Sequence, residues 1–473
     1  MKNKLNIAIF IICALVAGAL VYQIITLDLL PNQLLVIVIC FVIILLLLCF
    51  ALSLKWKAFG NILMCLLVAM SGFGNFYLHK TNNLLGSISE LSEEKVKFSI
   101  VALKEFEHEP SSLGVISVGN LDFQSKALEK IGNEYEVKDY ADYESFPKAL
   151  YDGEVDSLLV SDSSIDLIEE NKPSFMKDIK VIDSFVITSE KKTIDSNVDI
   201  LNEPFNIYIS GKDAASIDSL SRSDVNIILS INPKTHQILM TGVPRDFFIP
   251  QTCQNNQKDK LTHTGTYGIA CTVDSMANYM NIPIDYYVEV NFESLVDVVD
   301  ALGGVTVDSP YDFVSLHGKY HFTKGPNEMD GDEALGFVRE RYSFQDGDRE
   351  RSRNQMRVLT AIIDKAMSPS IIGSYPKLMD TLSSSFKTNL TKKEMTSFIK
   401  SQLLNMSPWD IQQIQVNGSG SMTVSPALGF EVYVMVPNEE TVQGAQKLIE
   451  KLLANEVVTE EDIQKQNDLV AGK

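Results

Sequence analysis

Arginine is scarce in this sequence and confined to one part of it. The 473 residues contain only eight Arg, all between Arg222 and Arg357, whereas the remaining basic residues are Lys spread along the chain. Arg offers a rigid planar fork that binds phosphate or carboxylate in a bidentate manner, whereas Lys offers a point charge. The distribution therefore indicates one region with a specific use for Arg.

Other absences narrow the possible functions. No Walker loop, Gly-x-Ser-x-Gly elbow, helix-turn-helix or metal-binding Cys/His pattern accompanies the arginines. A net charge of −20 argues against binding nucleic acid or anionic membrane through net charge, and a hydrophobic share of 45% excludes a disordered chain. Only Cys253 and Cys271 lie outside the apolar N-terminal segments. An oxidising exterior favours a disulfide between them, with two separate buried thiols as the alternative.

The first 80 residues are far more apolar than the rest. Residues 5–25, 34–54 and 59–78 form three apolar stretches, and about 20 such residues cross a bilayer as a helix. A cleaved signal peptide is the alternative for the first stretch, but no small-x-small cleavage site stands out and two more apolar stretches follow. We therefore expect residues 1–80 to anchor the protein in the cell membrane.

The basic residues orient this anchor. Lys2 and Lys4 precede the first stretch, Asp28 is the only charge between the first two, and Lys55 and Lys57 follow the second. Because short cytoplasmic segments are enriched in Lys and Arg, we expect a cytoplasmic N-terminus and an extracellular location for everything after the anchor. That outer part carries a net charge of about −24, because the first 80 residues hold five Lys and one Asp.

Two domains of the α/β class are predicted outside the membrane. After a polar linker at 81–95, residues 98–200 alternate β-rich runs with helical patterns and predict a small accessory domain. This domain has no Arg, no Cys and one His, so we assign it a binding or spacer role. Residues 204–456 predict a layered αβα domain with a central mixed sheet, and residues 457–473 predict a polar, frayed tail.

Individual elements of the second outer domain are also predicted. A turn at residues 232–235 joins two strands into a hairpin. Helical patterns cover residues 267–281, 292–302, 331–341, 350–367, 371–385, 392–405 and 440–454. Further strands are predicted at residues 411–416 and 430–436, so that strands and helices interleave along the whole domain.

Polar residues gather where the strands of this domain end. Asp213 follows one strand, Asp224 opens the next, and Arg245 and Asp246 follow the third. Loops at strand ends commonly hold ligand groups in α/β proteins. Mg²⁺ takes one or two carboxylates together with substrate phosphate oxygens, although an Asp in a turn also has a purely structural use. We therefore predict a site for Mg²⁺, or for Mn²⁺ in its place, at Asp213 and Asp224.

Six of the eight Arg fall within 19 residues, from Arg339 to Arg357. Guanidinium groups this close repel one another unless anions offset them. Nearby acidic residues account for two or three of them, and we assign Arg349 and Arg351 to such solvated pairs. Local pairing does not explain why Arg should also come from two distant segments, whereas a polyphosphate ligand does.

Several motifs together resemble the LytR–CpsA–Psr family, closely over residues 204–370. The motifs are Arg222-Ser-Asp224, Val243-Pro-Arg-Asp246, Lys260-Leu-Thr-His263, Val299-Asp-Ala-Leu-Gly-Gly-Val-x-Val307, Val338-Arg-x-Arg341 and Asp346-Gly-Asp-x-x-Arg-x-x-Asn-Gln355. Three apolar segments followed by an extra outer domain resemble the streptococcal capsule members. Where many members have Lys-Ile-Asn-x-Ala, this chain has Lys-Leu-Thr-His-Thr, and we interpret His263 as a loop or pocket-wall residue rather than a ligand.

The resemblance implies a membrane-anchored phosphotransferase. It would move a glycan, capsular polysaccharide in the members of this layout, from a polyprenyl pyrophosphate to peptidoglycan, forming a phosphodiester and releasing polyprenyl phosphate, with pyrophosphatase as a side activity. The family's metal ligands fall on Asp213 and Asp224. Its pyrophosphate-binding residues fall on Arg222, Arg245, Arg339, Arg341, Arg353, Gln355 and Lys260. The catalytic residues would be Arg245, Asp246, Arg341 and Arg353, with Asp246 as the base for the acceptor hydroxyl.

Two other functions remain open at this point. One is a DNA-binding regulator of capsule genes, in which the arginines bind DNA phosphates, but the expected topology and the acidic exterior oppose it. The other is a scaffold that binds the lipid pyrophosphate without turnover. The expected partners are the lipid-linked glycan, peptidoglycan, membrane lipid and other capsule-assembly proteins.

Overall fold

The computed structural model describes the chain except for residues 1, 29, 31, 90–92, 120, 191–193, 195, 214–216, 218, 369–377, 379–385, 405–407 and 473. Its internal contacts separate the chain into two units. The first unit comprises the residues up to Glu90 together with Gly373–Ser383 and Leu390–Pro408, and the second comprises the rest. The helix predicted at residues 371–385 lies outside the described residues, of which only Leu378 falls in that range.

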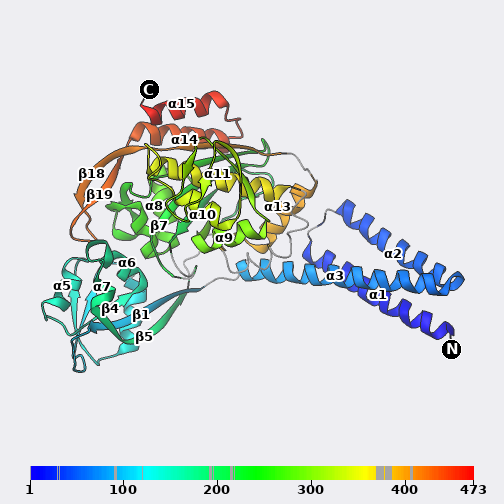
Figure 1. Ribbon diagram of the computed structural model, residues 1–473, viewed down its shortest axis with the longest axis horizontal. Helices are drawn as coiled ribbons and strands as arrows, with labels where there is room; N and C mark the ends of the chain where they lie inside the picture. The colour runs from blue at the N-terminus through cyan, green and yellow to red at the C-terminus, as the bar shows by residue number, and fades with distance from the viewer. Residues whose placement is uncertain are drawn as a thin grey trace. The chain divides into compact units, whose positions relative to one another are not determined.

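The first unit contains three long apolar helices, α1 (Lys2–Leu27), α2 (Asn32–Lys55) and α3 (Lys57–Ser89), each long and apolar enough to cross a membrane (Figure 1). Helix α3 continues through most of the predicted polar linker. Polarity alone does not end a helix, and residues 81–89 contain no proline. Helix α13 (Lys392–Leu404), predicted for the second outer domain, contacts α3 and belongs to this unit instead.

Asparagine side chains link the apolar helices. Asn6 Nδ2 donates to the carbonyl oxygen of Ser53 at 3.1 Å, and Asn61 Nδ2 donates to Asn6 Oδ1 at 3.1 Å. Asn75 Nδ2 donates to the carbonyl oxygen of Val16 at 3.0 Å. Hydrogen bonds between helices satisfy polar groups that lipid would leave without partners. The few polar residues of the apolar stretches therefore connect the helices.

The accessory domain opens the second unit and is built on a five-stranded mixed sheet in the order β3-β2-β4-β1-β5. β2 pairs in parallel with β3 and β4, whereas β1 pairs antiparallel with β4 and β5. The strands are β1 (Glu93–Leu103), β2 (Ser112–Ile116), β3 (Glu136–Tyr140), β4 (Ser157–Ser161) and β5 (Ile179–Glu190). The helices are α4 (Leu121–Ile131), α5 (Ser145–Tyr151), α6 (Asp162–Asn171) and α7 (Phe175–Asp178). The predicted α/β class of this domain is confirmed.

The second domain of this unit has a six-stranded mixed sheet in the order β16-β11-β6-β7-β8-β17. β6, β7 and β8 are antiparallel neighbours, and β11 and β17 add in parallel to β6 and β8. The strands are β6 (Phe205–Lys212), β7 (Ser223–Asn232), β8 (Gln237–Gly242), β11 (Tyr286–Asn291), β16 (Phe386–Thr388) and β17 (Asp410–Gln415). The predicted hairpin is β7–β8, where Asn232 Oδ1 accepts the N–H groups of Lys234 and Thr235. The predicted central mixed sheet is confirmed.

Helices and small strand pairs surround this sheet. The helices are α8 (Ile269–Met280), α9 (Phe292–Ala301), α10 (Gly331–Arg339), α11 (Asp348–Met367), α14 (Glu439–Leu453) and α15 (Glu460–Ala471), with the 3-10 helices η1 (Thr252–Gln254) and η2 (Leu261–Tyr267). The strand pairs are β9 (Phe248–Gln251) with β10 (Gln257–Lys260), β12 (Val305–Ser309) with β15 (Gly325–Met329), β13 (Phe313–Val314) with β14 (His321–Phe322), and β18 (Gly418–Val424) with β19 (Glu431–Pro437). The helices begin and end close to their predicted positions.

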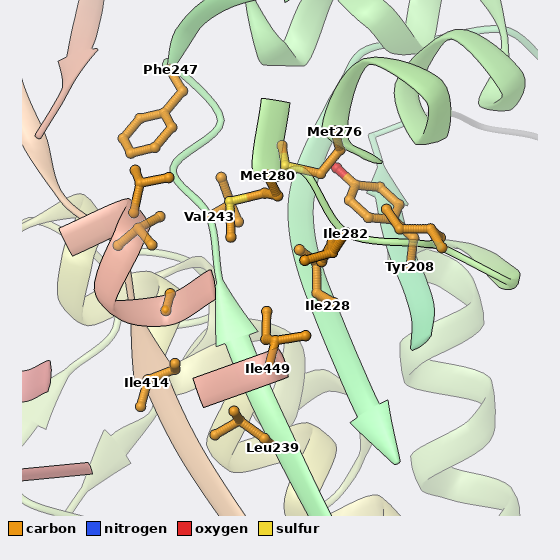
Figure 2. Packing of buried hydrophobic residues seen from close by; sticks show 14 of the residues in the cluster. Tyr208, Ile228, Leu239, Val243, Phe247, Met276, Met280, Ile282, Ile414 and Ile449 are labelled. Carbon is orange, nitrogen blue, oxygen red and sulfur yellow. The ribbon is translucent and has the colours of Figure 1, made fainter. Parts of the chain in front are cut away.

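A buried apolar cluster holds the helices to the sheet. Figure 2 shows Tyr208 of β6 and Ile228 of β7 close to Met276 and Met280 of α8, with Leu239 of β8 close to Ile449 of α14. Ile449 of α14 and Ile414 of β17 join the same cluster, as do Val243 and Phe247 from the segment after β8. This packing fixes the backbone on which the polar residues after β8 are placed.

The predicted polar tail is wrong, because residues 460–471 form helix α15. Thr459 and Asp462 form a capping box at its start, and α15 packs against α14 and β17 (Figure 1). Gln466 is 2% exposed and its Nε2 donates to the carbonyl oxygens of Gln415 and Thr441, both at 2.9 Å. A polar helix can dock through a few satisfied side chains, which hydropathy does not reveal.

Cys253 and Cys271 form a disulfide that closes a segment of 18 residues. The bond joins the 3-10 turn η1 to helix α8 and thereby ties the β9–β10 hairpin to the helical layer. The disulfide therefore restrains the loop between β9 and β10, and β10 ends at Lys260.

Candidate functional site

A polar pocket lies where β7, β8 and β17 meet the first turns of α11. It encloses about 480 Å³ of empty space, open mouth included. Its wall contains Asp224 and Asn226 of β7, the segment Gly242–Asp246 after β8, Asp348, Arg349, Arg351, Ser352 and Gln355 of α11, Gln415 and Val416 at the end of β17, and Met435 of β19. Charged residues from distant parts of the sequence therefore share one cavity.

Arg245 is the central cation of the pocket. Its Nη1 donates to Asp224 Oδ1 at 2.8 Å, and Thr262 Oγ1 donates to the same oxygen at 3.0 Å. Burial disfavours the charge, but Asp224 and Asp246 outweigh burial and raise the pKa of the guanidinium. The Nε–H of Arg245 is buried and has no hydrogen-bond partner in the part of the chain that the structure describes. A buried donor without a partner is uncommon and suits an anionic ligand.

Arg351 faces the same pocket, which corrects its predicted role as a solvated residue. Its side chain is only 15% exposed, and its Nη2 lies 3.3 Å from Asp348 Oδ1. Arg341 Nη1 lies 3.8 Å from that same oxygen, so two arginines share one carboxylate. Burial and the nearby Arg245 lower the pKa of the Arg351 guanidinium. The pocket wall therefore brings three arginines, Arg245, Arg349 and Arg351, close to three aspartates, Asp224, Asp246 and Asp348.

Arg353 is not among the residues that line the pocket, and its predicted role in binding pyrophosphate and in catalysis stays a prediction. Its Nη1 lies 2.7 Å from Glu350 Oε2, and Arg357 Nη1 lies 2.6 Å from Glu350 Oε1. Glu350 is 2% exposed and balances both cations. Arg351 and Gln355, four residues apart on α11, both line the pocket, as does Arg349, whereas Arg353 and Arg357 pair with Glu350 and are not among the lining residues.

A second ionic network lies behind the pocket. Lys260 Nζ is 3.6 Å from Asp246 Oδ1 and 3.8 Å from Glu170 Oε2, and Glu170 belongs to helix α6 of the accessory domain. Arg222 Nη1 donates to Glu170 Oε1 at 2.8 Å. Arg222 and Lys260, predicted to bind pyrophosphate, thus pair with a carboxylate of the other domain and are not among the residues that line the pocket.

His263 completes this network as a buried cation. Its Nδ1 lies 3.2 Å from Asp259 Oδ1 and its Nε2 lies 3.5 Å from Glu170 Oε1, and the side chain is fully buried. Neither contact has the geometry of a hydrogen bond, so the attraction is between charges. Burial disfavours the charged ring, but Asp259 and Glu170 outweigh burial and raise its pKa to about 9. Burial also works against the charge of Glu170, yet His263, Lys260 and Arg222 lower the pKa of Glu170 to about 2.

The remaining predicted residues lie at the loops after β6 and α10. Arg339 Nη2 donates to Asp213 Oδ2 at 2.9 Å, and the Arg339 guanidinium stacks over the Phe292 ring at 4.4 Å. Arg341 stacks over the Tyr342 ring at 4.6 Å and reaches the pocket through Asp348. Arg339 and Asp213 are both outside the lining of the pocket.

The predicted metal ligands, Asp213 and Asp224, lie where β6 ends and β7 begins. Lys212 pairs with Ser223 across β6 and β7, so Asp213 and Asp224 leave the sheet at neighbouring positions of one edge. Each now contacts an arginine, Arg339 and Arg245 respectively. Among the described residues, no cluster of three or more His, Cys, Asp or Glu side chains could hold a metal. Two carboxylates at an open edge fit Mg²⁺, which completes its shell with water and substrate oxygens.

The structure brings together part of the predicted site and adds residues that the sequence analysis missed. Asp224, Arg245, Asp246 and Gln355 line one pocket. Arg351 and Asp348 were missed, although the four-residue spacing of Arg351 and Gln355 was a usable signal. Glu170 was also missed, and nothing in the sequence links a Glu of the accessory domain to Arg222.

An arginine-lined pocket flanked by carboxylates at the strand ends of a mixed sheet defines an α/β protein suited to a polyphosphate ligand. Residues 179–454, more than half of the chain, match the LytR_cpsA_psr family. The chain belongs to the LytR–CpsA–Psr family, as its motifs indicate.

Two proteins of Bacillus species are similar in sequence to this chain. A polyisoprenyl-teichoic acid–peptidoglycan teichoic acid transferase TagU of Bacillus licheniformis is 35% identical over 226 residues, which cover 47% of this chain and 68% of that protein. The TagU of Bacillus subtilis is 36% identical over 211 residues, which cover 44% of this chain and 63% of that protein. The crystal structure of B. subtilis TagU is 30% identical, with a TM-score of 0.43 over 55% of this chain and all of that one. TagT bound to LIIa-WTA is 32% identical, with a TM-score of 0.45 over 55% of this chain and 94% of that one.

Proposed function

We propose that this protein is a membrane-anchored phosphotransferase that moves a glycan from a polyprenyl pyrophosphate to peptidoglycan. The observation that carries the proposal is the pocket lined by Arg245 and Arg351, in which the buried Nε–H of Arg245 has no hydrogen-bond partner among the described residues and lies 3.8 Å from Asp246 Oδ2. The names of the relatives, which are teichoic acid–peptidoglycan transferases, support the same class of reaction. In phosphoryl transfer the protein mainly positions groups and offsets developing charge, which paired arginines do well.

The proposed reaction balances without a further reactant. A peptidoglycan hydroxyl attacks the phosphorus attached to the glycan, the bond from that phosphorus to the bridging oxygen breaks, and polyprenyl phosphate leaves. Arg245, Arg351 and Gln355 bind the phosphate oxygens in the pocket, with Arg341 joining through Asp348. Asp246 accepts the proton of the hydroxyl. Its backbone is held in place by a hydrogen bond of 2.7 Å, which the N–H of Met435 donates to the carbonyl oxygen of Asp246. When bound, Mg²⁺ supplies positive charge to the diphosphate, and Asp213 and Asp224 would hold it.

The membrane anchor fits this substrate, because a polyprenyl carrier stays in the bilayer. We propose a cytoplasmic N-terminus and an extracellular site, on the distribution of Lys2, Lys4, Lys55 and Lys57 against Asp28. We also propose capsular polysaccharide as the glycan, since three apolar segments and an extra outer domain resemble the capsule members of the family. Teichoic acid, which appears in the names of the relatives, is the competing donor in the test.

The test uses the full chain in detergent micelles with Mg²⁺, peptidoglycan and either lipid-linked capsular glycan or lipid-linked teichoic acid. Mass spectrometry measures polyprenyl phosphate and the new phosphodiester. We expect both products, dependent on Mg²⁺ and largely lost in Asp224→Asn. Binding of the donor without either product would identify a scaffold and contradict the proposal. Phosphate release without a phosphodiester would show only the pyrophosphatase side activity.

A further inference from the structure

The accessory domain shares an apolar core with the domain that bears the pocket. The cluster combines Leu167, Ile168 and Phe175 of the accessory domain with Leu428, Val432 and Val434 from the β18–β19 hairpin and its connection. The backbone N–H of Tyr143 also donates to the carbonyl oxygen of Ala427 at 3.1 Å. Contacts between domains are polar and movable unless they are large and apolar. This apolar contact holds α6 against the pocket-bearing domain, which a spacer would not require.

Helix α6 presents two carboxylates to the segment that leads into β7. Asp166 Oδ2 accepts the hydroxyl hydrogen of Ser221 at 3.2 Å, and Glu170, one turn further along α6, accepts from Arg222 at 2.8 Å. Residues four apart lie on one face of a helix. The Glu170 side chain is only 14% exposed, so its charge acts with little screening by water.

Lys260 connects Glu170 to a carboxylate of the pocket, and Arg222, which pairs with Glu170, stands two residues before Asp224 in the chain. Lys260 lies between Glu170 and Asp246, at 3.8 Å and 3.6 Å. Arg222 donates to Glu170, and the charge of Asp224 also acts on its guanidinium. The accessory domain thereby sets how much of each cation remains for the proposed base Asp246 and the proposed metal ligand Asp224.

We propose that Glu170 is a positioning residue for the transfer reaction and makes the accessory domain part of the catalytic machinery. Glu170 pairs with Arg222 and shares Lys260 with Asp246, so that Asp224 stays available for the cation and Asp246 for the proton. Without the charge of Glu170, Arg222 and Lys260 shift toward the pocket carboxylates. This inference rests on the proposed transfer function.

The test compares Glu170→Gln, Glu170→Asp and the matched control Glu169→Gln in the full chain in micelles. For Glu170→Gln we expect kcat to fall about tenfold or more while KM for the lipid donor changes by less than about threefold. The Mg²⁺ concentration for half-maximal rate should rise about fivefold, because Arg222 then competes for Asp224. Glu170→Asp keeps the charge but shortens the side chain, and should recover a large part of kcat. Glu169→Gln should stay within about twofold of the native protein.

A second measurement needs no substrate. Amide hydrogen exchange over Leu261–Tyr267 should accelerate about tenfold in Glu170→Gln and not in Glu169→Gln, because the loop loses its partner on α6. A native-like kcat, or an unchanged Mg²⁺ requirement with faster exchange throughout the accessory domain, would overturn the proposal in favour of a purely structural contact. If Glu170→Gln does not fold, a Glu170→Asp protein with native kcat and native exchange overturns it equally. A native protein without transfer activity contradicts the proposed function instead, and exchange still decides whether Glu170 orders the loop.

Discussion

Helix α11 carries arginines on two faces, and the difference between the faces separates structural from ligand-binding arginines. Arg353 and Arg357 share the buried carboxylate of Glu350, at 2.7 Å and 2.6 Å. Arg351 faces the pocket, shares Asp348 with Arg341 and lies near Arg245. Arg353 and Arg357 pair with a buried carboxylate, whereas Arg351 shares the more exposed Asp348 with Arg341 at 3.3 Å and 3.8 Å and so keeps more of its charge for a ligand. Arg351 also holds the Arg position of the Asp346-Gly-Asp-x-x-Arg motif, so motif and counterion both distinguish Arg351 from Arg353.

If Arg351 and Arg353 contributed equally to the reaction, the distinction between the two groups of arginines on α11 would be wrong. We expect Arg351→Ala to lower the rate of polyprenyl phosphate release about a hundredfold or more, as loss of a donor to developing charge does. Arg353→Ala should lower it less than about fivefold, because its side chain serves Glu350. Initial rates of the two purified variants, with circular dichroism to confirm folding, decide the matter. Equal losses would mean that Arg353 also reaches the substrate.

The buried network behind the pocket should make stability depend on pH. The pKa of His263 is raised from 6.5 to about 9, so its contribution is complete below about pH 6.5 and is lost as pH rises through about 9. The loss is at most about 3 kcal/mol, since one pKa unit corresponds to about 1.4 kcal/mol. Denaturant unfolding of the full chain between about pH 6 and about pH 10 measures it. His317→Gln, an exposed control, should keep the dependence, and a flat native profile would show that His263 is neutral.

The structural face of α11 should respond in stability. Glu350→Gln removes the charge between Arg353 and Arg357, and we expect a loss of about 2 kcal/mol, below the usual cost of breaking a fully buried pair because both arginines are partly exposed. Chemical denaturation compares it with Glu461→Gln, whose exposed pair with Lys465 should leave stability unchanged. Equal stability of the two variants would place Glu350 outside the structural core of the helix.

The smallest effect is expected at Gln355, a neutral residue on the pocket face. Gln355→Ala should lower the transfer rate about fivefold, as expected for one hydrogen bond of about 1 kcal/mol. Gln345→Ala, on the exposed loop before α11, serves as the control and should leave the rate unchanged. A loss as large as that of Arg351→Ala would show that position on the helix matters more than charge.

Much of the fold could be predicted because its signals are local. The apolar stretches, the hairpin turn at Asn232 and the alternation of strands and helices each depend on neighbouring residues. Helix α15 was missed because its docking depends on Gln466, whose partners Gln415 and Thr441 are distant in the sequence. A polar residue is expected at the surface unless it finds hydrogen-bond partners, and the sequence does not show partners that are distant along the chain.

The candidate site was predictable in part for the same reason. Arg245 and Asp246 follow the end of β8, and Asp224 stands at the start of β7. Arg351 was assigned to a solvated pair with a nearby acidic residue; it does pair with Asp348, but it is only 15% exposed and lines the pocket, because a helical spacing shows which residues share a face and not where that face points. Glu170 has no sequence signal, since it meets Arg222 only through the docking of the accessory domain.

The confinement of arginine to one domain, the three apolar segments before it and the family motifs near the ends of strands and helices can all be read from neighbouring residues. Tertiary structure decided which of these arginines are available to a ligand and which are balanced by Glu350, and it brought a carboxylate of the accessory domain to the rear of the pocket. The physical reason is that composition and periodicity are properties of neighbouring residues. The balance of charge at a site depends instead on residues that only packing brings within a few ångströms of one another.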